Sequence, residues 1–265
     1  MIKYHGAPFG GTKSEAAEAL IGRHAFISFA APSHLDVCLE VCQSVALDNG
    51  AFTAWKQGKE VDWNEYFKWA GAYVRNPCVD WAIIPDVIDS GKGAEGDEEA
   101  NLKLIARWHE WFHTDGMSFG VPVWHMHESD TKLKYLSHAY KRIAIGSSAE
   151  FSKVGSEKWH ERMTWAMRLI CDANGQPKTK LHMLRGLDPA VFQMYPFASA
   201  DSTNAARNCN IETAWKGTYA PPSNSWRARV IMARTEAYNS CQNWKEPLPE
   251  WLASPLTDLF GCEII

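Results

Sequence analysis

Three aspartates stand directly after short apolar stretches of the chain, at Asp48, Asp86 and Asp201. A carboxylate in such a place can attack an electrophilic carbon as a nucleophile, or exchange a proton as a general acid and base. Each aspartate alone could equally cap the helix that follows it. Three at equivalent positions, one beside the turn residue Gly50, are harder to explain by capping and favour a catalytic cluster.

Histidines offer a second chemistry at similar positions. His125 and His127 form a His-x-His pair at the end of an apolar stretch, and His182 lies in a later stretch. With Asp201 they could hold a metal ion, in a site that resembles those of metal-dependent amidohydrolases. That class carries its histidine pair on the first strand, whereas the pair here follows about the fourth. We therefore expect no resident metal and keep the metal-dependent hydrolase as an alternative.

The positions of these residues depend on the elements that carry them. Short apolar stretches alternate with amphipathic ones, in which hydrophobic side chains recur every three or four residues at 98–113 and 157–170. Strands are expected at 26–30, 44–47, 81–85, 120–125, 142–145, 180–184 and 197–200, with an eighth near 216–220. Such alternation predicts parallel strands joined by right-handed crossovers, so the fold class is α/β, a (β/α)8 TIM-type barrel.

A barrel gathers the residues that follow its strands at one mouth, where barrel enzymes hold their catalytic groups. The alternative is a doubly wound open sheet, which needs a glycine-rich loop after the first strand, and residues 29–34 do not supply one. We expect a single barrel domain over 1–265. Within it, 221–265 forms a C-terminal helical extension packed on the barrel, with a loop-rich tail at 247–255.

Composition sets the broad class of protein. The chain has 265 residues, of which 46% are hydrophobic and 22% charged, which is typical of a globular protein with a large core. No apolar run is long enough to span a membrane, and the first residues lack the apolar core of a signal peptide. Seven scattered cysteines indicate reduced thiols. We expect a cytoplasmic protein without a membrane partner.

The order and spacing of six short segments resemble those of the queuine-type tRNA-guanine transglycosylase superfamily. The first is the turn Asp48-Asn49-Gly50-Ala51-Phe52, followed by Asp86 at a later strand end and by His125 in place of the family's glutamine. Then come Ala144-Ile145-Gly146-Ser147, a looser match at 182–186, and Asp201 with Arg207 downstream. The resemblance covers roughly residues 26–207.

Two departures narrow the resemblance. The tRNA enzymes carry a cluster of zinc-binding cysteines, whereas the corresponding region here has only Cys209 and Cys241, so we expect that zinc site to be absent. The chain is also shorter than those enzymes. Both features are similar to phage-encoded DNA-guanine transglycosylases, which insert 7-deazaguanine derivatives into DNA. The resemblance thus implies DNA as partner, a free base such as 7-cyano-7-deazaguanine as co-substrate, and the cytoplasm of an infected cell; tRNA is the alternative polymer.

The resemblance also implies roles for single residues. Asp201 would be the nucleophile that attacks the sugar C1′, and Asp48 the general acid and base. Asp86, His125, Gly146 and Ser147 would bind the base, with Phe52 and Met183 on either face of its ring. Phosphate contacts are expected from Arg207, Arg227, Arg229 and Arg234.

Two other interpretations remain open. The net charge of −4 gives no sign of nucleic-acid binding, so the arginines after residue 220 could equally form an ordinary solvated helix face. The chain could also be a nucleic-acid-binding module on a barrel that has lost its chemistry. In that case the aspartates at the strand ends should not converge.

Overall fold

A computed structural model of the chain describes residues 1–7, 9, 12–88, 91–211, 215 and 219–247, with the backbone alone for 114–118. Its strands are β1 (Ile2–Ala7), β2 (His24–Ser28), β3 (Ser44–Asp48), β4 (Val79–Ile83), β5 (Gly120–Val121), β6 (Val123–His125), β7 (Arg142–Gly146), β8 (Lys180–Met183) and β9 (Ser199–Ser202). Its helices are α1 (Lys13–Leu20), α2 (Leu35–Val41), α3 (Ala51–Lys56), α4 (Trp63–Gly71), α5 (Gly93–Phe119), α6 (Asp130–Ala139), the 3-10 turn η1 (Ala149–Phe151), α7 (Glu157–Ile170), α8 (Pro189–Phe192), α9 (Asn204–Asn208) and α10 (Asn224–Glu236).

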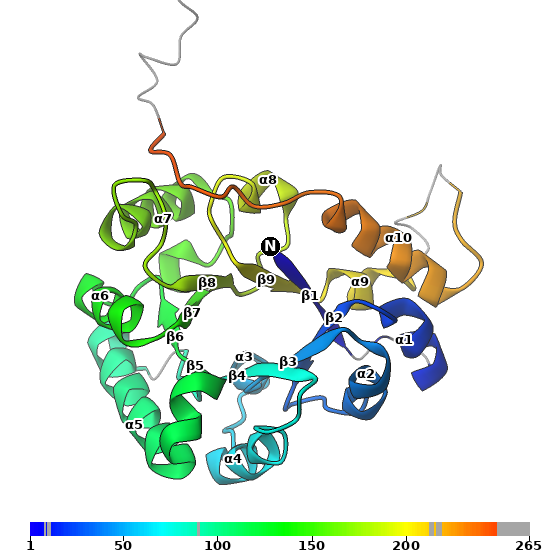
Figure 1. The fold of residues 1–265 in the computed structure, drawn as a ribbon, viewed down its shortest axis with the longest axis horizontal. Coiled ribbons are helices and arrows are strands. Elements are labelled where there is room, and N and C mark those ends of the chain that lie inside the picture. The colour runs from blue at the N-terminus through cyan, green and yellow to red at the C-terminus, as the bar shows by residue number, and fades with distance from the viewer. Residues whose placement is uncertain (8, 10–11, 89–90, 212–214, 216–218, 248–265) are drawn as a thin grey trace, which may run out of the picture.

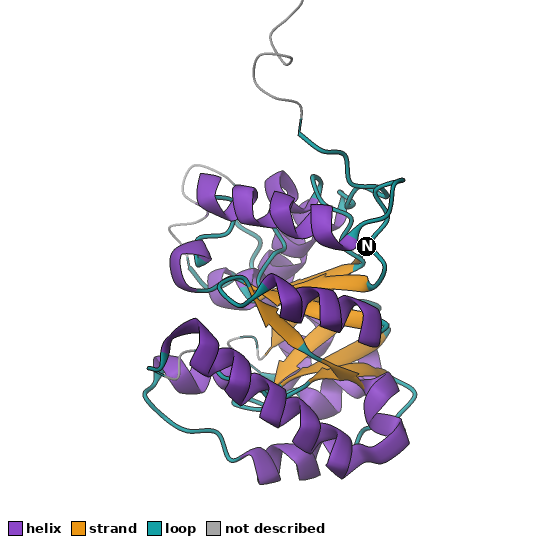
Figure 2. Cartoon of the chain, turned by 90° about the vertical axis from the view of Figure 1, so that its left-hand side faces the viewer, coloured by secondary structure: helices purple, strands orange, loops and turns teal. Residues whose placement is uncertain are grey.

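The strands form one parallel sheet that curls into a barrel, with the helices outside it (Figures 1 and 2). Their order is β5-β4-β3-β2-β1-β9-β8-β7-β6, so the two ends of the sheet are β5 and β6. Only Pro122 separates these two strands in the chain. The predicted strand 120–125 is therefore one strand interrupted by a proline, which has no N–H to give to a ladder. The sheet's two edges meet there, and the predicted TIM-type barrel is confirmed.

The eighth strand of the barrel is at the start of the chain. β1 pairs with β2 on one side and with β9 on the other, in parallel register. The predicted eighth strand near 216–220 is wrong where it can be judged: residues 219 and 220 have no strand structure, and 216–218 lie outside the described residues. The predicted tail at 247–255 lies outside them too, from residue 248 onward.

Two apolar layers hold the barrel together. Inside it lies a small cluster in which Tyr4, Phe26 and Trp81 pack edge to face or tilted against one another. Between the strands and the helices lies a much larger layer that includes Trp108, Trp124 and Trp159, all fully buried. Because successive side chains of a strand point to opposite faces, each strand supplies both layers in turn.

The helices for which the sequence predicted a range are present in the structure. α7 coincides with the predicted helix 157–170, and the predicted helix 98–113 lies within α5, which begins at Gly93 and is interrupted at His113, where φ is +47°. The predicted C-terminal helix is α10, which lies beside α1 and α9 on the barrel (Figure 1). Across the parts of the chain that the structure describes, no helix has the length and apolar character of a membrane span.

Candidate active site

A pocket of about 590 Å³ opens at the carboxyl ends of the strands. Its volume is ordinary for a small-molecule site. The catalytic end of a barrel is the expected place for it. Its lining includes Gly6, Ser28, Asp48, Asn49, Phe52, Lys56, Asp86, His125, Gly146, Ser147, Leu184, Arg185, Asp201 and Arg207. The structure thus brings the three aspartates of the sequence analysis into one cavity.

Asp48 ends β3 and starts the tight turn before α3. Gly50 has a φ of +80°, which favours glycine, and its backbone N–H donates to Asp48 Oδ2 at 3.2 Å. Burial above all, together with the negative charges of Asp201 and Asp86, raises the pKa of Asp48 from 3.8 to about 6, although a hydrogen bond from Ser28 lowers it. A carboxyl group with such a pKa can both give and take a proton near neutral pH.

Asp86 is buried in the pocket wall, held on both oxygens by neighbouring side chains. The Asn49 amide donates to Oδ1 and also to the Ile84 carbonyl, while His125 Nε2 lies 2.7 Å from Oδ2. A carboxylate has about four acceptor positions, so Asp86 can still accept a hydrogen bond from a ligand. The two partners fix the direction in which it does so.

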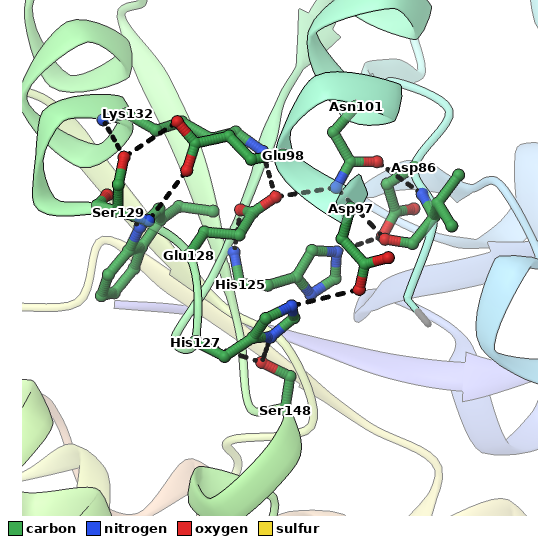
Figure 3. A network of polar contacts seen from close by, with 12 residues as sticks. Asp86, Asp97, Glu98, Asn101, His125, His127, Glu128, Ser129, Lys132 and Ser148 are labelled. Atoms are coloured by element: carbon green, nitrogen blue, oxygen red, sulfur yellow. Dashed lines mark hydrogen bonds and ion pairs between the residues drawn. The ribbon is translucent and has the colours of Figure 1, made fainter. Parts of the chain in front are cut away.

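His125 ends β6 and fits against the next strand because residue 146 is glycine. A Cβ at Gly146 would lie 2.7 Å from His125 Nδ1, closer than side-chain atoms approach in proteins. The backbone N–H of His125 donates to Glu128 Oε2 at 2.8 Å, and Glu128 is itself held by Asn101 and Lys132 (Figure 3). Glu128 and Lys132 form an ion pair without any exposed side-chain surface.

Asp201 enters the pocket from β9. Its Oδ1 accepts the backbone N–H of Arg185 at 2.8 Å and lies 3.4 Å from His182 Nε2. Among the described residues, these polar contacts of the carboxylate fall on Oδ1, which leaves Oδ2 available to a ligand. The Asp201 side chain is 5% exposed, so a group that reaches it must enter the pocket.

Arg185 is a site residue to which sequence analysis gave no role. Its guanidinium carbon lies 4.1 Å from the centre of the Phe52 ring, and its Nη2 donates to the Ser147 carbonyl at 3.0 Å. It therefore crosses the pocket from the residues after β8 to α3. The signal was present in the sequence, because Arg185 follows a predicted strand just as the three aspartates do.

The predicted pair of Phe52 and Met183 around a planar ring does not form. Met183 is fully buried in the layer between the strands and the helices, on the opposite face of β8 from Leu184, which lines the pocket. The resemblance placed a pocket residue at position 183, one residue away from the position that faces the pocket. Because successive side chains of a strand point to opposite faces, a shift of one residue moves the side chain to the other face of β8. Arg185 takes the place expected of Met183 opposite Phe52.

The arginines predicted to contact phosphates are divided between the pocket and the outer surface of the barrel. Arg207 lines the pocket, whereas Arg227, Arg229 and Arg234 lie on α10. There Arg227 donates to the Pro221 carbonyl, and the other two pack over the rings of Trp226 and Trp215. Ser147 also lines the pocket, and its side chain accepts a hydrogen bond from Trp159 Nε1.

His127 does not join His125 at the pocket. Its Nδ1 contacts Ser148 Oγ, and its Nε2 lies 3.2 Å from Asp97 Oδ2, in a separate dyad beside that of His125 and Asp86 (Figure 3). The two histidines therefore have different carboxylate partners. Within the residues that the structure describes, no group of three His, Cys, Asp or Glu side chains has the arrangement of a metal site.

Comparisons with known proteins add little about the chemistry. No known family model matches the chain, and no curated protein matches it. Among solved structures it is similar to a protein described as a fructose-1,6-biphosphate aldolase from Coccidioides immitis, with 12% sequence identity, a TM-score of 0.48 and 89% of each chain covered. At that identity and TM-score, the likeness carries no argument about the reaction at this pocket.

Proposed function

We propose that this chain is an enzyme that exchanges guanine in a nucleic acid, with DNA as polymer, for a free 7-deazaguanine base. The observation that carries the proposal is the convergence of Asp48, Asp86 and Asp201 on one pocket. It argues against a barrel that serves only as a binding module, because nothing in passive binding requires three carboxylates to converge. The fold alone does not select this reaction.

Each carboxylate has a task in such an exchange. Asp201 attacks the sugar C1′ through Oδ2 as the bond from C1′ to the purine N9 breaks, and the electron pair of that bond stays on N9. Protonated Asp48 gives N9 a proton, so neutral guanine leaves and a covalent glycosyl-aspartate remains, as in retaining glycosidases. The incoming base then transfers its N9 proton to Asp48 and displaces Asp201 from C1′.

Asp86, Phe52 and Arg185 recognise the base. Asp86, fixed by Asn49 and His125, accepts N–H groups from the Watson–Crick edge of the purine. Phe52 stacks on one face of the ring, and the Arg185 guanidinium lies over Phe52 until the base enters. The target nucleotide has to leave the helix stack, which costs a few kcal/mol. Arg207 and Lys56, both in the pocket lining, are suited to the flanking phosphates.

The test is a base-exchange assay with two polymers in parallel. Purified protein is given 7-cyano-7-deazaguanine with DNA or with tRNA, and incorporation is measured by mass spectrometry of the digested polymer. Incorporation into DNA that is lost in Asp201→Asn, with the fold intact by circular dichroism, supports the proposal. Incorporation into tRNA alone would keep the mechanism and replace the polymer, which rests on the sequence resemblance.

Two further measurements test the recognition of the base and the alternative of a metal-dependent hydrolase. Asp86→Asn should raise the KM for the base by roughly 10-fold or more and leave DNA affinity nearly unchanged, because a buried hydrogen bond to the base is lost. Exchange should continue in the presence of a chelator. The metal-dependent hydrolase would be favoured instead if activity required a divalent metal. It would also be favoured if a folded protein exchanged no base with either polymer.

A further inference from the structure

Four polar side chains form a line through the interior of the barrel and end at Asp201. Arg142 Nη1 lies 2.8 Å from Ser199 Oγ, and Ser199 Oγ lies 2.9 Å from His182 Nδ1. His182 Nε2 then lies 3.4 Å from Asp201 Oδ1. The line begins near the amino end of the barrel, where Arg142 lines a second, smaller cavity. It thus connects the two ends of the barrel through its core.

The donors and acceptors along this line have one consistent assignment. An arginine only donates, so Ser199 Oγ accepts from Arg142 and has its own hydrogen left to give to His182 Nδ1. A neutral imidazole that accepts at Nδ1 carries its hydrogen on Nε2, which faces Asp201. The opposite tautomer would leave the serine hydrogen without an acceptor and direct a lone pair at the carboxylate.

The surroundings of His182 keep the ring neutral and in place. It has no exposed surface and packs against Trp81, Phe26 and Tyr4, with ring centres 4.7, 5.5 and 5.9 Å away. Burial lowers its pKa, although Asp201 acts in the other direction. Within the described residues, Nε2 has no hydrogen-bond partner of good geometry. The contact that the structure gives this atom is with Asp201 Oδ1, at 3.4 Å.

We infer that His182 is a positioning residue for Asp201, fixed in its Nε2–H tautomer by Arg142 through Ser199. The inference rests on the proposed function, in which Asp201 is the nucleophile. With His182 and the Arg185 backbone N–H both directed at Oδ1, the attacking oxygen is Oδ2. His182 acts through Asp201, because it is buried beneath the pocket and has no access to the substrate.

The first experiment needs no enzymatic activity. Nitrogen-15 spectra of the histidine rings report which ring nitrogen carries the proton, and His182→Gln assigns the His182 signals by their disappearance. We expect a protonated Nε2 and an unprotonated Nδ1 in the wild type across the neutral pH range. Ser199→Ala should produce a mixture of the two tautomers. A protonated Nδ1 in the wild type, or no response to Ser199→Ala, would overturn the inference even if base exchange is confirmed.

The second experiment separates positioning from packing. His182→Leu fills the space without a donor, whereas the side-chain N–H of His182→Gln lies near that of the imidazole Nε2. We expect kcat to fall by up to roughly 100-fold in the leucine variant, because a misplacement of about 1 Å in a reacting group costs that much, and to recover by most of that loss in the glutamine variant. KM should stay within about 2-fold in both, because neither touches the base.

The control is His109→Gln, which changes a histidine bonded to Tyr140 on the outer side of the barrel. It should leave kcat and KM unchanged. A folded His182→Leu protein with wild-type kcat, or a glutamine variant no better than leucine, would reject the positioning role. If the wild type itself exchanges no base, the proposed function fails, and the tautomer measurement still decides the assignment of His182.

Discussion

The raised pKa of Asp48 has a consequence for stability that can be measured without substrate. The pKa of this carboxyl is 3.8 in an ordinary setting and about 6 in the fold, because burial and the charges of Asp86 and Asp201 disfavour its ionised form. Each unit of pKa corresponds to about 1.4 kcal/mol, and water in the pocket screens part of the effect. The ionised Asp48 therefore costs the folded state on the order of 2–3 kcal/mol.

The sign of the pH dependence follows from linkage. Between about pH 4 and pH 6 the folded protein keeps a proton on Asp48 that the unfolded chain has already released, so stability falls as pH rises through this window. Above it the cost is complete and constant. Asp48→Asn has nearly the same shape and no charge, so the variant should gain on the order of 2–3 kcal/mol relative to wild type between about pH 4 and pH 8.

Urea unfolding at a series of pH values measures this difference. Its pH-dependent part is free of any constant effect of the substitution, such as an altered hydrogen bond to Gly50. Glu161→Gln, which removes an exposed carboxylate from α7, is the control and should show little change with pH. A free-energy difference between Asp48→Asn and wild type that stays flat from about pH 4 to pH 8 would refute the assignment of Asp48 as a carboxyl poised near neutrality.

Two further predictions concern the groups that support the pocket. Gly146→Ala should displace the His125 ring, which would cost about 1–3 kcal/mol of stability and most of the exchange activity. Gly71→Ala is the control and should change little, because its Cβ would lie 3.4 Å from the nearest atom. Thermal unfolding and initial rates compare the two variants. Lys132→Met should lower the free energy of unfolding in urea by about 3–5 kcal/mol, because it leaves the buried Glu128 unpaired. Adding Glu128→Gln should restore much of the lost stability. Equal losses in the single and the double variant would contradict the pairing.

The one strand that sequence analysis did not find is β1, and the reason is its outer face. Lys3 and His5 stand on either side of Tyr4 in the sequence. Their polar side chains would be expected on an exposed face, yet both are buried. Lys3 Nζ donates to Asn239, and His5 Nε2 contacts Glu236, at the end of α10. Those partners are more than two hundred residues away in sequence, so no local pattern reports them.

The remaining strands were predictable because their buried stretches are continuous and their turns carry distinct residues. The convergence of Asp48, Asp86 and Asp201 followed from a single rule about parallel barrels. The role of His182 did not, because it depends on Ser199 and Arg142, which lie on neighbouring strands. Pairing between strands is set by the closed sheet as a whole.

The pairing of β1 with β9 also determines when the barrel can close during synthesis on the ribosome. The two strands pair although roughly 190 residues separate them, and β1 is made first. At synthesis rates of about 5–20 residues per second, on the order of 10–40 s pass between the synthesis of β1 and that of β9, its partner on the side away from β2. Throughout that interval the edges of the nascent sheet are unpaired and open to other chains. The barrel can therefore close only after synthesis has passed residue 202.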